Sequence, residues 1–396
     1  MNDELFLKII SNSPNPNLEQ LKKIRLELQK YINKDYSFNS VMEIILKELK
    51  EQSEQILYNY KQIVSGLSSS VFVNGHYINI IGGNKKRGVQ DKIDEQTLFD
   101  IASITKMYMG LLIMKLKEMG LIDTAKKINE LTKTFSLPNY SVDDLIHMRG
   151  IIVTPIRLDR CENSKQALNI LKKTYVEDEN KSIYTYTDIG LIILTYILEE
   201  IMNMKYSEIL DKYLLSPLGL SATYHPNFNV TGNGRKDNKP NDPKANILKH
   251  ENGSAGLFIN SNDLILLSKH LFDGKYLSLE TLKQFCWNNE SNSKGIFGCY
   301  TYHKQGLEKT YVPGLYSKDS FAFEGYTGSV VVFDLINKIH NNILVNTMFE
   351  NTLEKHPLYN RALRSYQEVL SEASIKICAL EKIFEEPQSF VKKIKI

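Results

Sequence analysis

The chain has 396 residues, of which 42% are hydrophobic and 24% are charged, and its formal net charge at pH 7 is +3. This length and composition predict a soluble globular protein with a large core, built as one to three domains. The small net charge gives no reason to expect nucleic acid or a membrane surface as a partner, so we expect neither.

The cysteines and the first residues of the chain predict its cellular compartment. Cys161, Cys286, Cys299 and Cys378 are far apart in the sequence and form no CxxC pair or metal-ligand spacing, which indicates free thiols in a reducing compartment. Residues 1–8 contain acids where a signal peptide carries positive charge, and no stretch approaches the roughly 20 apolar residues of a membrane-spanning helix. We therefore expect a cytoplasmic protein.

Helices followed by a hairpin are predicted at the start of the chain. Residues 18–32 and 41–63 are rich in Leu, Ile, Lys and Glu, with apolar residues at three- and four-residue spacing, as in amphipathic helices. Residues 69–73 and 76–81 lie on either side of Asn74-Gly75, a pair favoured in two-residue hairpin turns. The two segments are predicted to be antiparallel strands.

The rest of the chain changes from helical to strand-like patterns. From about 103 to 290 the pattern is mainly helical with long loops, and after 295 strands return. The predicted elements are helices at 189–204 and 262–272, a polar surface loop at 227–249, strands at 329–334 and 342–346, and a final helix at 359–383.

This order of elements predicts an α+β fold, in which one antiparallel β-sheet is flanked by helices and an all-α lobe is inserted between its early and late strands. We divide the chain into an N-terminal helical extension (1–40), a main domain (41–374) and a C-terminal tail (375–396). The sheet part of the main domain comprises 41–102 and 295–374, and its helical lobe comprises 103–294. The basic run Lys392-Lys393-Ile-Lys395 is expected to be a solvated part of the tail.

Ser103 and Lys106 are three residues apart, where a strand-like segment gives way to an apolar helix. Positions i and i+3 share one helix face, so the two side chains can meet. A serine hydroxyl becomes a good nucleophile when a base takes its proton, and a lysine kept neutral by its surroundings can be that base. The alternative is that Ser103 caps the helix and Lys106 points to solvent. Ser291-Asn-Ser-Lys294 and Ser389-Phe-Val-Lys392 share the spacing but open no apolar helix.

Several segments in a fixed order resemble the serine β-lactamase and penicillin-recognising hydrolase superfamily. The resemblance covers residues from about 60 to 370 and is greatest to the branch of class C β-lactamases, esterases and D-amino-acid peptidases. The segments are Phe99-Asp-Ile-Ala-Ser-Ile-Thr-Lys106, Val142-Asp-Asp-Leu-Ile-His147, Tyr184-Thr-Tyr-Thr-Asp-Ile-Gly190, Pro217-Leu-Gly-Leu220, Asp242-Pro-Lys-Ala245, Ser254-Ala-Gly-Leu-Phe258 and the stretch 321–334.

The resemblance implies roles for individual residues. Ser103 is expected to be the nucleophile that accepts the acyl group, and Lys106 is expected to be its base. Tyr186 is expected to be the phenol that bridges Ser103, Lys106 and the leaving group, although a buried tyrosine with a satisfied hydroxyl is the alternative. The backbone N–H groups of Ser103 and Tyr326 are expected to form the oxyanion hole.

The chain departs from the family pattern at Asp188, where the second motif usually ends in Asn. The carboxylate is expected to orient Lys106 or to receive a substrate amine. An aspartate is also favoured as the N-cap of the helix that begins at Ile189, and both roles can hold together.

A second departure lies in the third motif, where the family shows Lys-Thr-Gly or His-Thr-Gly and this chain has Phe323-Glu324-Gly325. Asp188 and Glu324 would then make the cleft acidic, which disfavours β-lactams because they present a carboxylate. We accordingly expect Asp188, Glu324, Gly325 and Tyr326 to contact substrate. The alternatives are that Tyr326-Thr327-Gly328 serves as the motif, or that Glu324 lies on an exposed strand edge.

Three functions follow as hypotheses. The first is a serine hydrolase that forms an acyl-enzyme at Ser103 with a small-molecule ester, amide or D-amino-acid peptide. The second is a true β-lactamase or penicillin-binding protein, and the third is a non-catalytic binding protein on the same fold. None of them needs a metal or a cofactor, and the eight histidines show no HExxH spacing. The pattern leaves the oligomeric state open.

Overall fold

A mixed β-sheet of seven strands lies at the centre of the described part of the chain. The computed structural model describes residues 13, 18–226, 229–231, 239–286, 295–301, 312–347, 357–385 and 387–396. Neighbouring strands are antiparallel, except that β11 and β2 run parallel at one edge. In order across the sheet, the strands are β11 (Val391–Lys395), β2 (His76–Gly83), β1 (Val64–Val73), β10 (Ile339–Thr347), β9 (Val330–Asp334), β8 (Ser320–Glu324) and β7 (Tyr300–Thr301).

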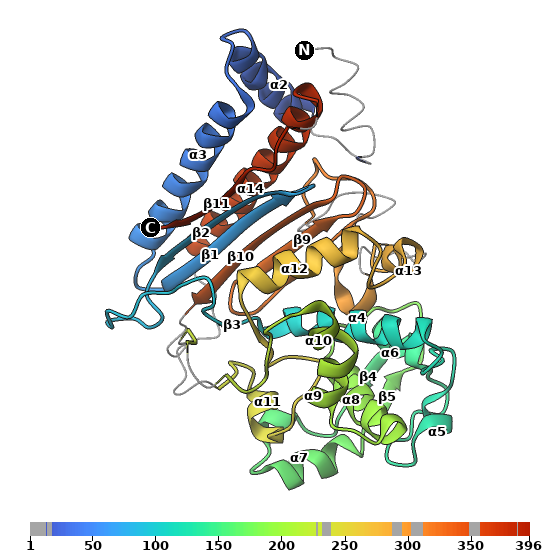
Figure 1. Ribbon diagram of the computed structural model, residues 1–396. Helices are drawn as coiled ribbons and strands as arrows, with labels where there is room; N and C mark the ends of the chain where they lie inside the picture. Colours follow the sequence, from blue (N-terminus) through green and yellow to red (C-terminus); the bar gives the residue numbers. More distant parts are fainter. Residues whose placement is uncertain are drawn as a thin grey trace.

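Among the described residues, three helices cover one face of this sheet (Figure 1). They are α2 (Leu18–Ile32), α3 (Phe38–Asn59) and α14 (Pro357–Ile383). Because side chains alternate along a strand, Val71 and Ile78 point to this face and join Ile45 of α3 and Leu370 of α14 in one buried cluster. The predicted N-terminal helices are therefore part of the sheet's cover.

The other face of the sheet packs against α12 (Ser261–Phe272) and the lobe inserted between β2 and β7 (Figure 1). Phe72 and Phe333, which alternate with the residues of the first face, point to this side. The ring of Phe72 stacks on that of Phe272 with centroids 6.1 Å apart. The predicted arrangement of a mostly antiparallel sheet flanked by helices is confirmed.

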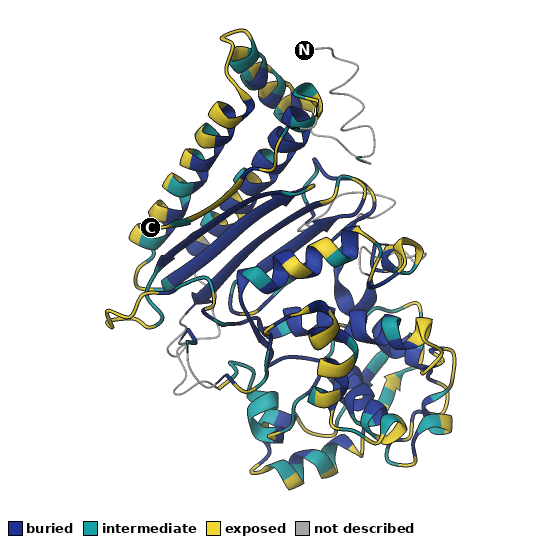
Figure 2. Ribbon diagram, viewed as in Figure 1, coloured by how far each residue is buried: buried dark blue, intermediate teal, exposed yellow. Residues whose placement is uncertain are grey.

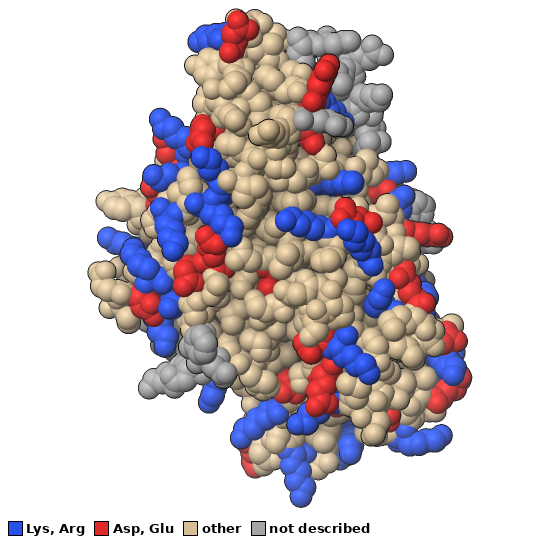
Figure 3. Space-filling model, viewed as in Figure 1, with Lys and Arg blue, Asp and Glu red and all other residues tan. Residues whose placement is uncertain are grey.

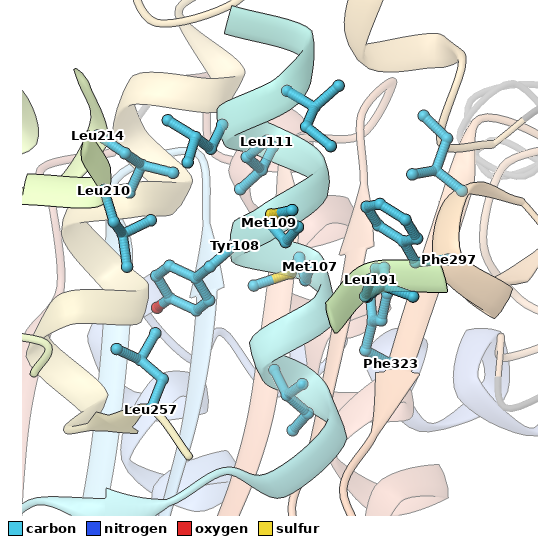
Figure 4. Close-up of a cluster of buried hydrophobic side chains, with 14 of the residues drawn as sticks. Met107, Tyr108, Met109, Leu111, Leu191, Leu210, Leu214, Leu257, Phe297 and Phe323 are labelled. Carbon is cyan, nitrogen blue, oxygen red and sulfur yellow. The ribbon is translucent and has the colours of Figure 1, made fainter. Parts of the chain in front are cut away.

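Helix α4 (Thr105–Glu118) forms the centre of the lobe and carries the predicted nucleophile motif at its start. Its side chains Met107, Tyr108, Met109 and Leu111 are fully buried, so the helix is surrounded by protein on all sides (Figure 4). Figure 2 shows the same burial along the central strands. Around α4 lie α5 (Ile128–Leu131), α6 (Val142–Ile146), α7 (Ser164–Leu171), α8 (Ile189–Met202), α9 (Tyr206–Leu210), α10 (Ser216–Leu218), α11 (Pro243–Leu248) and α13 (Leu279–Lys283).

The lobe is not all-α, as the sequence pattern had suggested. β4 (Ile151–Val153) and β5 (Tyr175–Asp178) form a small antiparallel sheet within it. These strands are short and half-exposed, so they lack the continuous apolar run that marks a buried strand. The predicted loop 227–249 contains α11, and its residues 227–228 and 232–238 lie outside the described residues.

The C-terminal segment also differs from the prediction. Residues 391–395 do not form a solvated tail but pair with β2 as the edge strand β11. Phe390, just before the strand, is buried in the cluster shared with α3 and α14. Lysine side chains on β11 remain largely exposed, which is common at sheet edges because it discourages pairing with other chains.

The hairpin and several termini agree with the sequence. Val73 pairs with His76, so Asn74 and Gly75 form a two-residue turn with φ angles of 44° and 102°. The side chain of Ser37 caps α3 by accepting the Ser40 N–H at 3.2 Å.

All four cysteines are free and buried. None of the helices in the described ranges is long and apolar enough to cross a bilayer.

Candidate active site

A strained turn places Ser103 at the start of α4. The turn follows β3 (Phe99–Asp100), which pairs with β6 (Phe258–Ile259), and passes through a short 3₁₀ segment, Ala102–Ile104. Ala102 has a φ of 44°, a left-handed conformation that non-glycine residues rarely adopt. The carboxylate of Asp100 holds the turn by accepting the Ala102 N–H at 2.8 Å and the Asn241 N–H at 2.6 Å. A strained backbone conformation that surrounding contacts hold in place is typical of functional sites.

Tyr186 and Lys106 both reach the Ser103 hydroxyl. The Tyr186 hydroxyl donates to Ser103 Oγ at 2.8 Å, and Lys106 Nζ donates to the same oxygen at 3.0 Å. Lys106 Nζ also lies 5.1 Å from the centre of the Tyr186 ring. Because Tyr186 is 51% exposed, this group of side chains is open to solvent on one side. Tyr186 is therefore not the buried structural tyrosine of the alternative prediction.

Lys106 is held as an ammonium group. Its three N–H donors have three acceptors: Ser103 Oγ, the Ser254 carbonyl oxygen at 2.8 Å and Asp188 Oδ1 at 2.7 Å. Burial by itself lowers the pKa of Lys106, but the adjacent carboxylate of Asp188 outweighs it, and the net pKa is raised. The sequence pattern predicts a lysine kept neutral by its surroundings as the base, whereas these contacts favour the ammonium form in the free protein.

Asp188 lies between two lysines. It occupies the N-cap position of α8, but its side chain makes no capping hydrogen bond. Its carboxylate contacts Lys106 through Oδ1 and Lys244 through Oδ2, each at 2.7 Å. Burial raises the pKa of Asp188, and the two lysines outweigh this effect and bring the pKa to about 2. Asp188 thus contacts Lys106, as an orienting role requires, but does not cap the helix with its side chain.

Lys244 is a site residue that the sequence reasoning did not identify. It lies in the first turn of α11, where Pro243 precedes it and Asp242 caps the helix by accepting the Ala245 N–H at 2.8 Å. Lys244 Nζ is also 3.5 Å from Asp242 Oδ2. The segment Asp242-Pro-Lys-Ala245 resembles a family segment, but nothing in that pattern indicates that its lysine meets Asp188.

Glu324 does not face Ser103. Along β8, Phe321 and Phe323 point toward the lobe, whereas Ala322 points toward α14. Glu324 has the same parity as Ala322, and it lines a cavity of about 120 Å³ with Asn360, Arg364 and Gln367 of α14. The Glu324 side chain thus lies on the face of the sheet opposite the lobe, and this position argues against the predicted contact with substrate. The first position of the third-motif slot, Phe323, is an apolar side chain buried on the lobe side (Figure 4).

The turn after β8 is fixed beside the nucleophile turn. A Cβ atom on Gly325 would lie 2.5 Å from the Ile101 carbonyl oxygen, so only glycine permits this approach. Thr327 Oγ1 donates to the Asp100 carbonyl oxygen at 3.0 Å. Tyr326, between these two residues, is therefore held next to the segment that carries Ser103.

The other charged groups indicate no metal site. In the described residues, no group of three or more His, Cys, Asp and Glu side chains is placed to hold a metal ion. On the face shown in Figure 3, basic and acidic side chains are interspersed. In the described part of the site, Tyr186 and Lys106 contact Ser103, and Asp188 and Lys244 continue this group of side chains beyond Lys106.

The chain is similar to known proteins over most of its length. The Beta-lactamase family model matches residues 48–365. A beta-lactamase of Providencia stuartii is 24% identical over 306 residues, which cover 74% of this chain and 70% of that protein.

Two solved structures show the same fold. EstCE1, described as a hydrolase with promiscuous acyltransferase activity, superposes with a TM-score of 0.65 at 16% identity, over 83% of this chain and all of its own (100%). The beta-lactamase/D-alanine carboxypeptidase of Pseudomonas syringae gives a TM-score of 0.65 at 17% identity, over 82% and 98% of the two chains. With the match of the family model to most of its length, the chain belongs to the beta-lactamase family.

Proposed function

We propose that this protein is a serine hydrolase that forms an acyl-enzyme at Ser103 with a small ester, amide or D-amino-acid peptide. One observation carries the proposal: Ser103 Oγ lies 2.8 Å from the Tyr186 hydroxyl and 3.0 Å from Lys106 Nζ. A nucleophilic serine needs an acceptor for its proton and a group that holds its oxygen in place. We assign the first role to Tyr186 and the second to Lys106.

The charge on Lys106 determines how we assign the proton transfers. In the proposed acylation, the Tyr186 hydroxyl turns its hydrogen from Ser103 Oγ toward the leaving group. Ser103 Oγ then attacks the substrate carbonyl carbon while its proton moves to the Tyr186 oxygen, and Tyr186 passes its own proton to the leaving group as the bond between that group and the carbonyl carbon breaks. Lys106 remains an ammonium and stabilises the negative charge that develops on these oxygens. The backbone N–H groups of Ser103 and Tyr326 bind the oxyanion. Water then attacks the ester, and the proton path runs in reverse.

The charges near Ser103 favour an uncharged acyl group. Asp188 is neutralised by Lys106 and Lys244, and Glu324 lies on the other face of the sheet, so the acidic cleft expected from the sequence is absent from the described site. The third-motif slot presents Phe323 in place of the family's lysine or histidine. Neither a substrate ammonium nor a carboxylate therefore has a dedicated partner at these positions.

A serine-directed probe tests the proposal. We expect intact-mass spectrometry to show one fluorophosphonate adduct per chain in the wild type and none in Ser103→Ala. Ser254→Ala is a matched control, because Ser254 contacts Lys106 only through its backbone carbonyl oxygen. An adduct that persists in Ser103→Ala would contradict the proposal, and a wild type that takes up no label would favour a non-catalytic binding protein.

A β-lactamase or penicillin-binding activity is the second candidate. The neutralised Asp188 favours it, because the acidic cleft that argued against a carboxylate-bearing substrate is not found. Incubation with penicillin tests this candidate under the same conditions. A Ser103-dependent penicillin adduct would support it, and a phosphonate adduct without a penicillin adduct would favour the esterase or peptidase activity.

A further inference from the structure

We infer that Lys244 is a positioning residue of this site, which holds Asp188 in the orientation that keeps Lys106 against Ser103. The inference rests on the proposed function and extends it to a residue outside the three motifs. The contacts form an unbroken series: Lys244 Nζ to Asp188 Oδ2 at 2.7 Å, Asp188 Oδ1 to Lys106 Nζ at 2.7 Å, and Lys106 Nζ to Ser103 Oγ at 3.0 Å.

Both oxygens of Asp188 need a charged donor. The Asp188 side chain is 14% exposed, and that of Lys106 is 1% exposed, so little water is available to replace a missing partner. Removing one partner of a buried ion pair leaves the remaining charge without compensation. Without Lys244, the Asp188 carboxylate would be free to turn toward other donors, and its hold on Lys106 would weaken.

Lys244 comes from a segment that is fixed relative to the nucleophile turn. The Asn241 N–H donates to Asp100 Oδ2 at 2.6 Å, and Asp100 holds the strained turn at Ala102. The Asn246 side chain donates to the Pro240 carbonyl oxygen at 2.7 Å, which closes the start of α11 on the preceding loop. The position of the Lys244 ammonium is thereby tied to the position of Ser103.

Asp188 and Lys244 are chemically matched. A lysine ammonium only donates hydrogen bonds, and a carboxylate only accepts them. An Asn at position 188 would offer an NH₂ group in place of one carboxylate oxygen, so it cannot satisfy both Lys106 and Lys244 as Asp188 does. This chain has Asp188 where the second motif usually ends in Asn, and Lys244 binds the second carboxylate oxygen that this change provides.

A double-mutant cycle tests whether Lys244 acts through Asp188. We would measure the second-order rate constant of fluorophosphonate labelling for the wild type, Lys244→Met, Asp188→Asn and the double variant. Small misplacements of reacting groups can cost up to 100-fold in rate, so we expect Lys244→Met to lower the rate constant roughly 10-fold or more. In the Asp188→Asn background the same change is expected to alter it by less than about 2-fold, because the two residues are coupled.

The controls separate positioning from folding. Lys244→Arg keeps a cation at the carboxylate and is expected to restore most of the rate. Lys85→Met removes an ion pair outside the motif segments and should label at the wild-type rate. In this pair Lys85 Nζ lies 3.0 Å from Asp91, and the two side chains are 17% and 54% exposed. The final labelled fraction counts folded, reactive molecules, so misfolding lowers that fraction whereas misplacement lowers the rate constant.

Each outcome is decisive. A wild-type rate in Lys244→Met, or an equal fold-loss in both backgrounds, overturns the role of Lys244 and leaves the proposed function intact. A wild type that takes up no label at Ser103 overturns the proposed function and with it the role of Lys244. A loss that is confined to the Asp188 background and restored by Lys244→Arg supports the inference.

Discussion

At the scale of single residues, the partner of a buried ionisable group decides its charge. Lys106 and His340 are both almost fully buried, at 1% and 0% exposed. The carboxylate of Asp188 raises the pKa of Lys106 in spite of burial. His340 donates from Nδ1 to the Val332 carbonyl oxygen and accepts from the Asn342 amide at Nε2, and burial lowers its pKa to about 3. Lys106 is therefore charged at neutral pH, whereas His340 is neutral.

His340 makes stability depend on pH. In the unfolded chain the imidazole titrates near 6.5, and in the folded protein near 3, so acid favours unfolding in this range. Above pH 6.5 the imidazole is neutral in both the folded and the unfolded chain. As the pH falls toward 3, it takes up a proton only in the unfolded chain, so the free energy of unfolding decreases. Between neutral pH and about pH 4.5 we expect this loss to reach about 2–3 kcal/mol.

Urea unfolding at several pH values measures this effect. His340→Gln should show a smaller decrease in the free energy of unfolding over this pH range than the wild type. His225→Gln is the control, because the His225 side chain is 73% exposed. Parallel decreases in the wild type and His340→Gln would show that His340 does not titrate as described.

The sequence located part of the site because local spacing is enough for some residues. Ser103 lies in the short 3₁₀ segment that leads into α4, Lys106 lies in the first turn of α4, and Tyr186 lies three residues before α8, so short motifs mark them. The motif spacing does not reveal the direction of the Glu324 side chain, because that direction depends on which face of β8 meets the lobe. Lys244 was missed because its contact with Asp188 joins two segments that are distant in sequence.

At the scale of elements, strong local signals predicted the structure well and weak ones did not. Helix α2 begins and ends where the apolar spacing indicates, and Asn74-Gly75 forms the expected turn. The strands β4, β5 and β11 were missed because they are short and partly exposed, and their pairing partners stabilise them more than their own sequences do.

Two glycine-to-alanine substitutions should have opposite effects. Gly75 has a φ of 102°, which alanine adopts only with strain, so Gly75→Ala is expected to lower the free energy of unfolding by about 1 kcal/mol or more. Gly190 is the second residue of α8, where an added Cβ would meet Leu145 at an ordinary 3.5 Å, so Gly190→Ala is expected to raise the free energy of unfolding by about 0.5 kcal/mol or less. Urea unfolding of both variants measures the difference, and a loss of equal size in both would contradict the predicted turn geometry.

At the scale of the whole molecule, two hydrophobic clusters on opposite faces of the sheet hold the sheet and the lobe together. One cluster joins the sheet to α2, α3 and α14, and the other joins it to α12 and the lobe. The C-terminal segment belongs to the first cluster through Phe390. The sequence predicted the two layers and the insertion, but the basic composition of residues 392–395 concealed the final strand.

Substitution of Phe390 by alanine tests whether residues 390–395 belong to the folded core or form a solvated tail. Phe390 is 6% exposed, so Phe390→Ala is expected to lower the free energy of unfolding by about 3 kcal/mol through lost burial and the cavity left behind. Lys395→Ala, on the exposed edge of β11, should change it by less than about 0.5 kcal/mol. Equal stability of both variants in urea would mean that the segment does not belong to the core.

The most direct test of the account is to locate the acyl group during turnover. Protein turning over a p-nitrophenyl ester would be quenched in acid, and its peptides analysed by mass spectrometry. The account predicts a mass increase equal to the acyl group on the peptide that contains Ser103, and no turnover above background in Ser103→Ala. Turnover that persists in Ser103→Ala, an acyl group on another peptide, or no turnover of any ester in the wild type would contradict it.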